Sequence, residues 1–370
     1  MPTMLAGTKR RLRLFLGIVA LGTGGGIVFS VVVAIAYFPK ATLLGMAFAA
    51  LAAAIPGIVI FGVIAGAEIF LPQTRLGLAL ERAPFLVAFL IKSLVYSTLI
   101  VLVVGSKLGR WLAAYLVLGP DAAQVMLQSR GFPVAVTIIV VFLVAPVAIL
   151  VIQFSGLVGG RNVRDIVLGR YHRSRIEERF FLFVDIVGST PLAERIGPAS
   201  VHGFLNRVFQ IASDPIDDHG GEIYQYVGDE VVITWTVAEG RAAARPLACY
   251  FAIERALAEA AGEFEREFGV VPRLRAALHA GPVITGEVGG SRRAIVFHGD
   301  VMNTTARLEN ATRELQRSFL VSEDALSRVE GKEAYTMADL GLQALRGRSV
   351  PVRVYAVELG TEAMKTTAPR

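Results

Sequence analysis

The chain has 370 residues, 54% of them hydrophobic, and its mean hydropathy is +0.56. This composition excludes an ordinary soluble enzyme and predicts membrane spans. The single cysteine, Cys249, excludes a framework of intrachain disulfides and is expected to be a small buried residue. The net charge is only +6, and arginines gather beside the apolar runs, which indicates membrane topology rather than nucleic-acid binding.

The first 158 residues predict a helical membrane domain with four spans. The long apolar runs are 14–38, 41–71, 85–104 and 133–158. Pro56 predicts a kink in the second run. The stretch 105–132 is expected to lie at the membrane interface, although a different division of this stretch and of the second run would give six spans.

An even number of spans puts the N-terminus and the C-terminal half on one side of the membrane. Basic residues at the N-terminus, in the loop that contains Arg75, and after Gly160 predict that this side is the cytoplasm. The expected location is therefore the cell's inner (plasma) membrane. Glu68 and Lys92 lie inside the second and third spans and are candidate functional residues, with the alternative that Glu68 reaches the interface.

Residues 159–179 form a basic connector with six arginines. The favoured interpretation is a collar at anionic lipid headgroups. The connector is also the only covalent path between the two halves of the chain, so a signalling role is an open alternative.

The stretch from Phe180 to Trp235 carries the chemistry. An apolar run ends at Asp185 and is followed by Gly188, Ser189 and Thr190, and a hairpin has Asp229 in its Gly-Asp turn. Taken singly, each aspartate is more often a helix cap or a turn residue.

The two aspartates meet if the first strand lies beside the hairpin. Neighbouring carboxylates repel unless a cation lies between them, and Mg²⁺ combines carboxylate with phosphate oxygens. Backbone N–H groups at the following helix start favour a triphosphate. The stretch therefore predicts a two-metal nucleotide site.

The remaining pattern predicts an α+β domain over 180–360 and a C-terminal tail over 361–370, with an antiparallel-rich sheet and helices on one face. The expected helices are 191–196, 198–219, 241–268 and 301–312. The expected strands are 180–185, 223–227, 231–235, 273–279, 283–288, 295–297, 319–321, 335–340 and 350–358, with a turn at 280–282.

Asn303 and Arg307 are four residues apart, which places them on one face of the predicted helix. A guanidinium held beside an amide suits the negative charge of a transferring phosphoryl group. The alternative is a surface arginine paired with Glu309 or Glu314.

The C-terminal half resembles the catalytic domain of class III nucleotidyl cyclases, the adenylate and guanylate cyclases, over roughly residues 170–358. Residues 183–190 are similar to the first metal motif of that family, 226–230 to the second, and 299–307 to its transition-state motif. The resemblance implies a ferredoxin-like domain that works as a head-to-tail homodimer on a nucleoside triphosphate, with no nucleic-acid partner.

The resemblance also implies roles for residues. Asp185, Ile186 and Asp229 of one subunit would hold two Mg²⁺ or Mn²⁺ ions, while catalytic Asn303 and Arg307 come from the other subunit. The implied substrate-binding residues are Gly188, Ser189, Thr190, Gln225, Gly228, Val296 and Arg346. Arg346 stands where the family usually has a lysine on the terminal phosphate.

Base specificity is the point at which the chain departs from the family. Gln225 and Val296 stand at the base-reading positions, which usually hold Lys with Asp or Thr. Glutamine can read a base edge through its amide, whereas valine offers no hydrogen bond. The resemblance favours ATP and cyclic AMP, and it leaves GTP, a pyrimidine nucleotide or a catalytically silent nucleotide sensor as alternatives.

Overall fold

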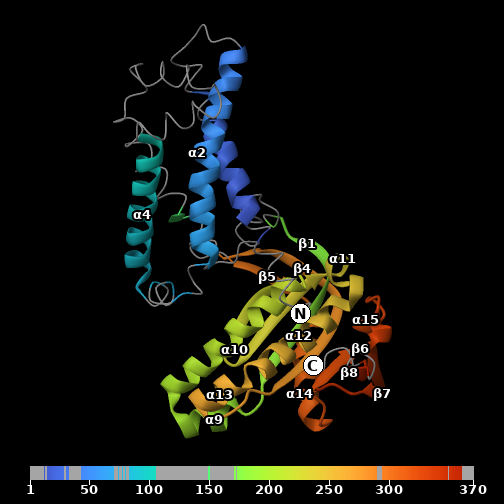
Figure 1. The fold of residues 1–370 in the computed structure, drawn as a ribbon. Helices are drawn as coiled ribbons and strands as arrows, with labels where there is room; N and C mark the ends of the chain where they lie inside the picture. The colour runs from blue at the N-terminus through green and yellow to red at the C-terminus, as the bar shows by residue number, and fades with distance from the viewer. Residues whose placement is uncertain are drawn as a thin grey trace. The chain divides into compact units, whose positions relative to one another are not determined.

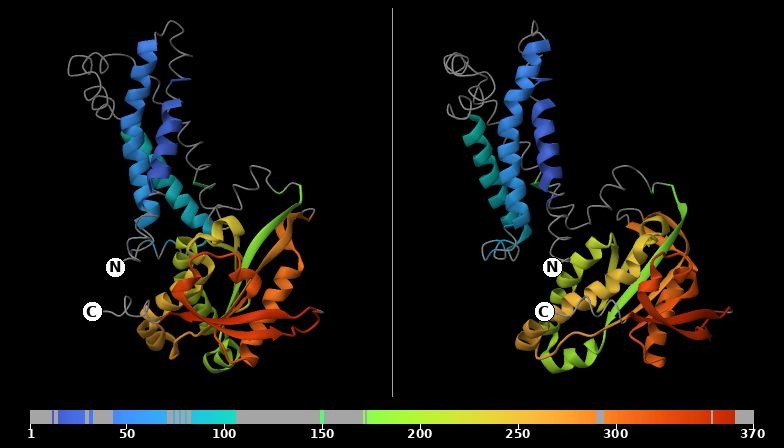
Figure 2. Two further views of the ribbon diagram at one scale, coloured as in Figure 1. Left: turned by 90° about the vertical axis from the view of Figure 1, so that its right-hand side faces the viewer. Right: turned by 45° about the vertical axis from the view of Figure 1, so that its right-hand side comes forward.

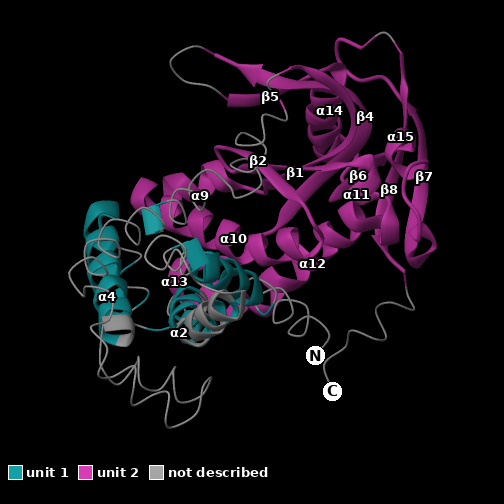
Figure 3. Cartoon of the chain, turned by 90° about the horizontal axis from the view of Figure 1, so that it is seen from above, with its two compact units in different colours: residues 1–158 teal, residues 159–370 magenta. Residues whose placement is uncertain are grey.

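The computed structural model describes residues 15–28, 43–70, 83–105, 149–150, 171, 173–289, 294–348 and 350–360, with residues 12, 31, 32, 74, 77 and 80 (Figure 1). The chain divides into two compact units, residues 1–158 and 159–370, which are coloured separately in Figure 3.

The first unit contains two long apolar helices, α2 (Leu43–Phe70) and α4 (Phe85–Gly105). Helix α4 confirms that the third apolar run is helical, and among the described residues it is the one helix long and apolar enough to cross a membrane, over Phe85–Leu102. Shorter apolar helical segments are Phe15–Val28 and Gly57–Glu68. The interfacial stretch and nearly all of the fourth predicted span lie outside the described residues.

Helices α2 and α4 are joined by polar contacts as well as apolar ones. Glu68 of α2 accepts hydrogen bonds from Lys92 Nζ and from the Tyr96 hydroxyl of α4, each at 2.8 Å. Ile60 and Ile64 of α2 pack in the same cluster as Tyr96. The two ionisable residues of the predicted spans therefore pair with each other.

The second unit is built on one mixed sheet with the order β2-β3-β1-β4-β6-β8-β7, and β5 also pairs with β4. Only β4 and β6 run parallel among the described pairs. Figure 2 shows β7 and β8, in red, as a hairpin at one edge of the sheet. The strands are β1 (Arg175–Ile186), β2 (Glu222–Val227), β3 (Glu230–Thr236), β4 (Leu274–Val288), β5 (Ala294–His298), β6 (Phe319–Ser322), β7 (Tyr335–Gln343) and β8 (Val352–Leu359).

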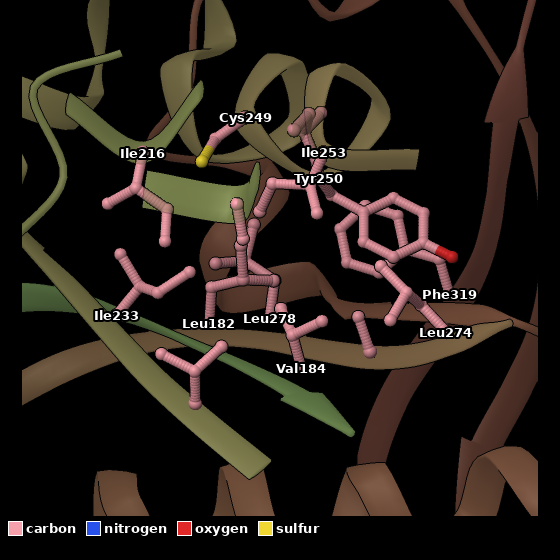
Figure 4. Packing of buried hydrophobic residues seen from close by; sticks show 14 of the residues in the cluster. Leu182, Val184, Ile216, Ile233, Cys249, Tyr250, Ile253, Leu274, Leu278 and Phe319 are labelled. Atoms are coloured by element: carbon pink, nitrogen blue, oxygen red, sulfur yellow. The ribbon is translucent and has the colours of Figure 1, made fainter. Parts of the chain in front are cut away.

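The sheet is apolar on both faces because successive side chains of a strand point to opposite sides. In β1, Leu182 and Val184 belong to one buried cluster, whereas Phe181 and Phe183 belong to another. The first cluster packs under the helices α9 (Ser189–Ile196), α10 (Pro198–Asp218), α12 (Arg245–Glu259) and α13 (Ala261–Phe268). Figure 4 shows this cluster, including Cys249, which is free and fully buried as expected.

Helix α14 (Asp300–Glu314) covers the other face of the sheet. The expectation of helices on one face only is therefore wrong, although the α+β pattern is confirmed. The reason lies in β1 and β4, whose alternate side chains are apolar on both sides and need a cover on both sides.

Strand β4 (Leu274–Val288) is one strand, whereas two strands, 273–279 and 283–288, joined by a turn were expected. β1 pairs with β4 without interruption from Arg175↔Thr285 to Ile186↔Leu274, so the expected turn at Ala280-Gly281-Pro282 is inside the sheet. Gly281 has a packing role there, because a Cβ atom at this position would lie 2.8 Å from Val301 Cγ2 of α14.

The helix expected over 241–268 is also divided. A short helix (Val237–Gly240) and a 3₁₀ turn (Ala242–Ala244) precede α12, which starts at a proline-bearing first turn. The chain bends again at Ala260, and this bend lets Phe264 and Phe268 of α13 pack edge-on against Phe204, each with centroids 5.5 Å apart. Sequence offered no breaker at Ala260, so this bend could not be foreseen.

Candidate active site

Strand β1 ends between two charged neighbours. Asp185 lies opposite Glu230 of β3 on one side and opposite Arg275 of β4 on the other. Asp229 directly precedes Glu230 in the β2–β3 turn, so the two predicted aspartates come together as expected. The prediction rested on an apolar strand lying beside a Gly-Asp hairpin, and the pairing of β1 with β3 and of β3 with β2 confirms that arrangement.

The aspartates have different partners. The Ser189 hydroxyl donates a hydrogen bond to Asp229 Oδ2. Arg275 Nη2 donates to Asp185 Oδ2, and Arg313 Nη2 approaches the same oxygen at 3.5 Å. The Asp185 side chain is 7% exposed and that of Arg275 16%, so this contact is shielded from water, whereas Arg313 is largely exposed.

The site carries an excess of negative charge. Burial raises the pKa of Asp185, and the charge of Asp229 adds to this rise, against the hydrogen bond from Arg275. Burial and the charges of Glu309, Asp185 and Asp229 raise the pKa of Glu230 to about 7. The pKa of Glu309 is also raised, by burial first and then by Asp185.

This arrangement fits a hard divalent cation. Two adjacent carboxylates whose charges oppose each other are stabilised by a cation, and carboxylate oxygen is the ligand that Mg²⁺ and Mn²⁺ prefer. Asp185 and Asp229 could supply these ligands, whereas Ile186 is buried and could offer only its main-chain carbonyl. In the part of the chain that the structure describes, no group of three or more His, Cys, Asp or Glu side chains is arranged to hold a metal, so further ligands would come from main chain or substrate.

Gly188 and Ser189 open helix α9 beside the aspartates. Gly188 is the N-cap residue, and its φ of 78° lies in the left-handed region that glycine adopts at least cost. The first intrahelical bond runs from Leu192 N–H to Gly188 O. The N–H groups of Ser189 and Thr190 therefore lack helical partners and are the donors that an anion at a helix start uses.

Helix α14 presents two different sides. Glu309 is buried against Arg275, the neighbour of Asp185, with its Oε1 3.6 Å from Arg275 Nε. Asn303 is exposed and Arg307 is half-buried, and the two lie on one face, roughly 120° and 160° around the helix from Glu309. Arg307 forms no ion pair with any described residue, which disfavours the alternative of a surface pair with Glu309 or Glu314.

The loop after β7 closes over the Arg307 side of α14. A Cβ atom on Gly347 would lie 3.5 Å from Arg307 Nη2, so Arg346 is on a loop next to Arg307. Arg348 Nη1 donates to the Thr304 hydroxyl at 2.6 Å and fixes this loop to the helix. Arg346 itself is exposed.

The predicted base-reading residues lie on separate strands. Gln225 is exposed on β2, near the exposed Gly228 of the turn. Val296 is half-buried on β5, where it pairs with Gly286 of β4.

Arg275 and Glu309 are the neighbours of the aspartates that sequence reasoning missed. Arg275 is the only charged residue in the apolar stretch Leu274–Leu278, and that isolation was the available signal. Its Nε atom and Glu309 Oε1 are both buried without a hydrogen-bond partner. Their position beside Asp185 depends on the β1–β4 register, which sequence alone does not give.

Comparison with known proteins places these features in a family. The model of the adenylate and guanylate cyclase catalytic domain matches residues 172–359, just over half of the chain. The chain is 38% identical over 213 residues to Adenylate cyclase 2 of Rhizobium meliloti (strain 1021), covering 58% of this chain and 59% of that protein. It is 30% identical over 190 residues to Adenylate cyclase 1 of the same organism, covering 50% of this chain and 28% of that protein.

Solved cyclase structures are also similar to this chain. The adenylyl cyclase CyaB from P. aeruginosa is 22% identical with a TM-score of 0.46, covering 52% of this chain and 98% of that one. A bacterial light-regulated adenylyl cyclase is 23% identical with a TM-score of 0.48, covering 58% of this chain and 63% of that one. On the strength of the matched family model, the chain belongs to the adenylate and guanylate cyclase catalytic domain family.

Proposed function

We propose that this chain is a membrane-anchored adenylate cyclase that converts ATP into 3′,5′-cyclic AMP and pyrophosphate. The observation that carries the proposal is the meeting of Asp185 and Asp229 at the end of β1, beside the open N-terminus of α9. The relatives that are named adenylate cyclases make ATP the first candidate substrate. The chain spans only 59% of the length of the first of them.

The reaction joins the ribose 3′-oxygen to the α-phosphorus and breaks the bond from that phosphorus to the β-phosphate oxygen, while the hydroxyl proton passes to solvent. When bound, two divalent cations, Mg²⁺ or Mn²⁺, would supply the charge that activates the attacking oxygen and stabilises the leaving pyrophosphate. Asp185 and Asp229 would hold them, with the carbonyl of Ile186. The hydrogen bond from Arg275 orients the Asp185 carboxylate and favours its ionised form, against the effect of burial.

The phosphate chain would lie at the start of α9. The free N–H groups of Ser189 and Thr190, with Gly188 permitting close approach of the backbone, suit the phosphate oxygens. Gly228, which has no side chain, would likewise let the phosphate chain approach the backbone at the hairpin turn.

Two copies of the chain would form each site. Asn303 and Arg307 point away from the carboxylates of their own chain, since Glu309 occupies the side of α14 that faces Asp185. A head-to-tail homodimer would bring this exposed pair to the partner's aspartates, where Asn303 orients the ribose and Arg307 stabilises the phosphoryl charge. Arg346, on the loop beside Arg307, would contact the terminal phosphate.

Base recognition would involve Gln225 and Val296. The glutamine amide can both donate to and accept from adenine, and valine would contribute only an apolar contact. GTP or a pyrimidine nucleotide is the second candidate substrate because this pair departs from the usual one.

The first unit would anchor the enzyme as a multi-pass domain in the inner membrane, with the catalytic domain in the cytoplasm. The apolar helix α4 supports this proposal, as does the mutual pairing of Glu68 and Lys92, because charges inside a bilayer are expected to face a partner helix. The lipid bilayer would thus be a permanent partner.

The test is product formation by membranes that contain the full chain. ATP, GTP, CTP and UTP are supplied in turn with Mn²⁺, and products are identified by mass beside an Asp185→Asn control. The proposal expects cyclic AMP, lost in the control. A different cyclic nucleotide would overturn the substrate, and no cyclic product from any nucleotide would favour a silent nucleotide sensor.

A further inference from the structure

A buried arginine lies in β1, six residues before Asp185. Arg179 is 2% exposed, and each of its three side-chain nitrogens donates one hydrogen bond. Nε donates to the Thr234 hydroxyl at 3.1 Å, Nη1 to Glu177 Oε2 at 2.9 Å, and Nη2 to Glu222 Oε2 at 2.8 Å. A fully buried arginine is rare unless its charge is paired, so this is a built arrangement.

The same guanidinium also lies over an aromatic ring. Its Cζ is 4.6 Å from the centroid of Phe297, within range of a cation–π interaction. Burial alone would lower the pKa of Arg179, but the charge of Glu222 and the hydrogen bond to Glu177 raise it above its ordinary value. The group therefore stays charged.

Two of the contacts of Arg179, those with Glu222 and Phe297, are with the strands that carry the base-reading positions, whereas Thr234 lies on β3 and Glu177 on β1 itself. Glu222 begins β2, three residues before Gln225, and Phe297 follows Val296 on β5. In the sheet order, β2 and β5 are separated by β3, β1 and β4. In a flat sheet this would put them roughly 19 Å apart.

Side chains of β2 and β5 nevertheless touch. The Tyr224 and Phe297 rings have centroids 4.8 Å apart, at 62°. The pairing of β2 with β3 shifts between Ile223 and Gln225, so Tyr224 is the extra residue of a β-bulge that aims its ring at β5. Arg179 lies at the centre of this closure, bonded to β2 and stacked on β5.

We infer that Arg179 is a positioning residue for base recognition, which holds β2 and β5 at a fixed separation and thereby sets the geometry of Gln225 and Val296. The inference rests on the proposed function for the location of the base. Because Val296 offers no hydrogen bond, purine recognition depends on how accurately these two strands are placed. The phosphate-binding start of α9 lies at the other end of β1 and is independent of this closure.

This separation defines the test, which measures binding without turnover. Membranes containing the full chain are loaded with Mn²⁺ and a fluorescent nucleoside triphosphate that lacks the 3′-hydroxyl and so cannot be cyclised. It is displaced by 3′-deoxy-ATP, by 3′-deoxy-GTP, which likewise lacks the attacking hydroxyl, or by inorganic tripolyphosphate, which has no base. The variants are Arg179→Lys, Phe297→Leu and Glu222→Gln.

The matched control is Arg207→Lys. Arg207 also donates through Nε and Nη2, at 2.8 and 2.9 Å, but to the single carboxylate of Glu263 and between the helices α10 and α13 rather than between strands. In Arg179→Lys the affinity for 3′-deoxy-ATP should fall about tenfold and its discrimination from 3′-deoxy-GTP should shrink, while tripolyphosphate affinity stays within about twofold. Phe297→Leu and Glu222→Gln should change the same quantities in the same direction, and Arg207→Lys should change none of them.

Equal losses for nucleotide and tripolyphosphate, or unchanged nucleotide affinity in all three variants, would overturn the inference. If Arg179→Lys does not accumulate in the membrane, Phe297→Leu and Glu222→Gln decide the question. A wild-type chain that binds nucleotides but forms no cyclic product would refute the proposed activity. The affinities for 3′-deoxy-ATP, 3′-deoxy-GTP and tripolyphosphate, compared between variants and wild type, would still test the role of Arg179. A chain that binds no nucleotide at all would refute both.

Discussion

Asp185 and Arg275 lie directly opposite each other on β1 and β4, and the guanidinium donates a hydrogen bond to the carboxylate in a site with little solvent exposure. Arg275 Nε in turn lies 3.6 Å from Oε1 of buried Glu309. The pair therefore connects the candidate metal site to helix α14, and it offers a direct test of how the carboxylates are stabilised.

Arg275→Met should destabilise the catalytic domain by about 3 kcal/mol, because it removes the less exposed of the two arginines beside the buried carboxylates of Asp185 and Glu309 and leaves only the largely exposed Arg313. Activity should fall with it, since Asp185 would favour its protonated form. Thermal unfolding of the solubilised chain measures the first effect. Arg207→Met is the control, because its ion pair with Glu263 is more than one-third exposed and should contribute less than about 1 kcal/mol. Equal shifts in the two variants would contradict this account.

Buried His279 should make stability depend on pH below neutrality. Its Nδ1 lies 2.7 Å from the Ser322 hydroxyl, and burial lowers the pKa of His279 from 6.5 to about 4. Between these pH values the unfolded chain binds a proton that the folded chain does not, so stability should rise as pH increases from 4 to 6.5 and be lost as it falls.

A His279→Asn variant should reduce this dependence, because asparagine can keep a hydrogen bond to Ser322 without titrating. Unfolding curves of both proteins at intervals across this pH range provide the comparison. Identical pH dependence in variant and wild type would refute a role for His279.

The Glu68–Lys92 pair should couple helices α2 and α4. Lys92→Met or Glu68→Gln alone leaves one charge unpaired between apolar helices and should lower the unfolding temperature of the first unit, residues 1–158. The double variant should recover much of the loss, since neither charge remains. Strictly additive losses in the double variant would indicate that the two residues act independently.

Gly281 should limit how closely α14 packs on β4. In Gly281→Val the new Cβ atom would lie 2.8 Å from Val301 Cγ2, and this overlap should cost about 1–3 kcal/mol while reducing activity through displacement of Asn303 and Arg307. Combining Gly281→Val with Val301→Ala should restore part of the lost stability and part of the lost activity. Gly262→Ala, where nothing lies within 4 Å, should be neutral or slightly stabilising.

The sequence predicted local chemistry better than long-range pairing. The strand ending at Asp185, the hairpin around Asp229 and the helix carrying Asn303 and Arg307 were all found from periodicity and turn residues. Arg275 could not be predicted as a site residue, because its contact with Asp185 depends on which strand lies beside β1.

The remaining differences have physical causes of the same kind. Ala280-Gly281-Pro282 has the composition of a turn, but uninterrupted pairing with β1 keeps it in a strand. The continuous apolar run of β1 allowed a core on both faces of the sheet, yet only the position of α14 shows that the second face is covered. Arg179, at the end of a basic connector, resembled another headgroup arginine and is instead fully buried.

The central claim is that each site combines Asp185 and Asp229 of one copy with Asn303 and Arg307 of another. Asp229→Ala and Arg307→Ala chains should each be inactive alone. When the two are co-expressed in one membrane, a hybrid dimer rebuilds one intact site, and cyclic nucleotide formation should return to about a quarter of the wild-type rate, since about half of randomly formed dimers are hybrids and each hybrid has one of two sites. Absence of product from the mixture, with association of the two chains confirmed by pull-down of differently tagged copies, would contradict the shared site.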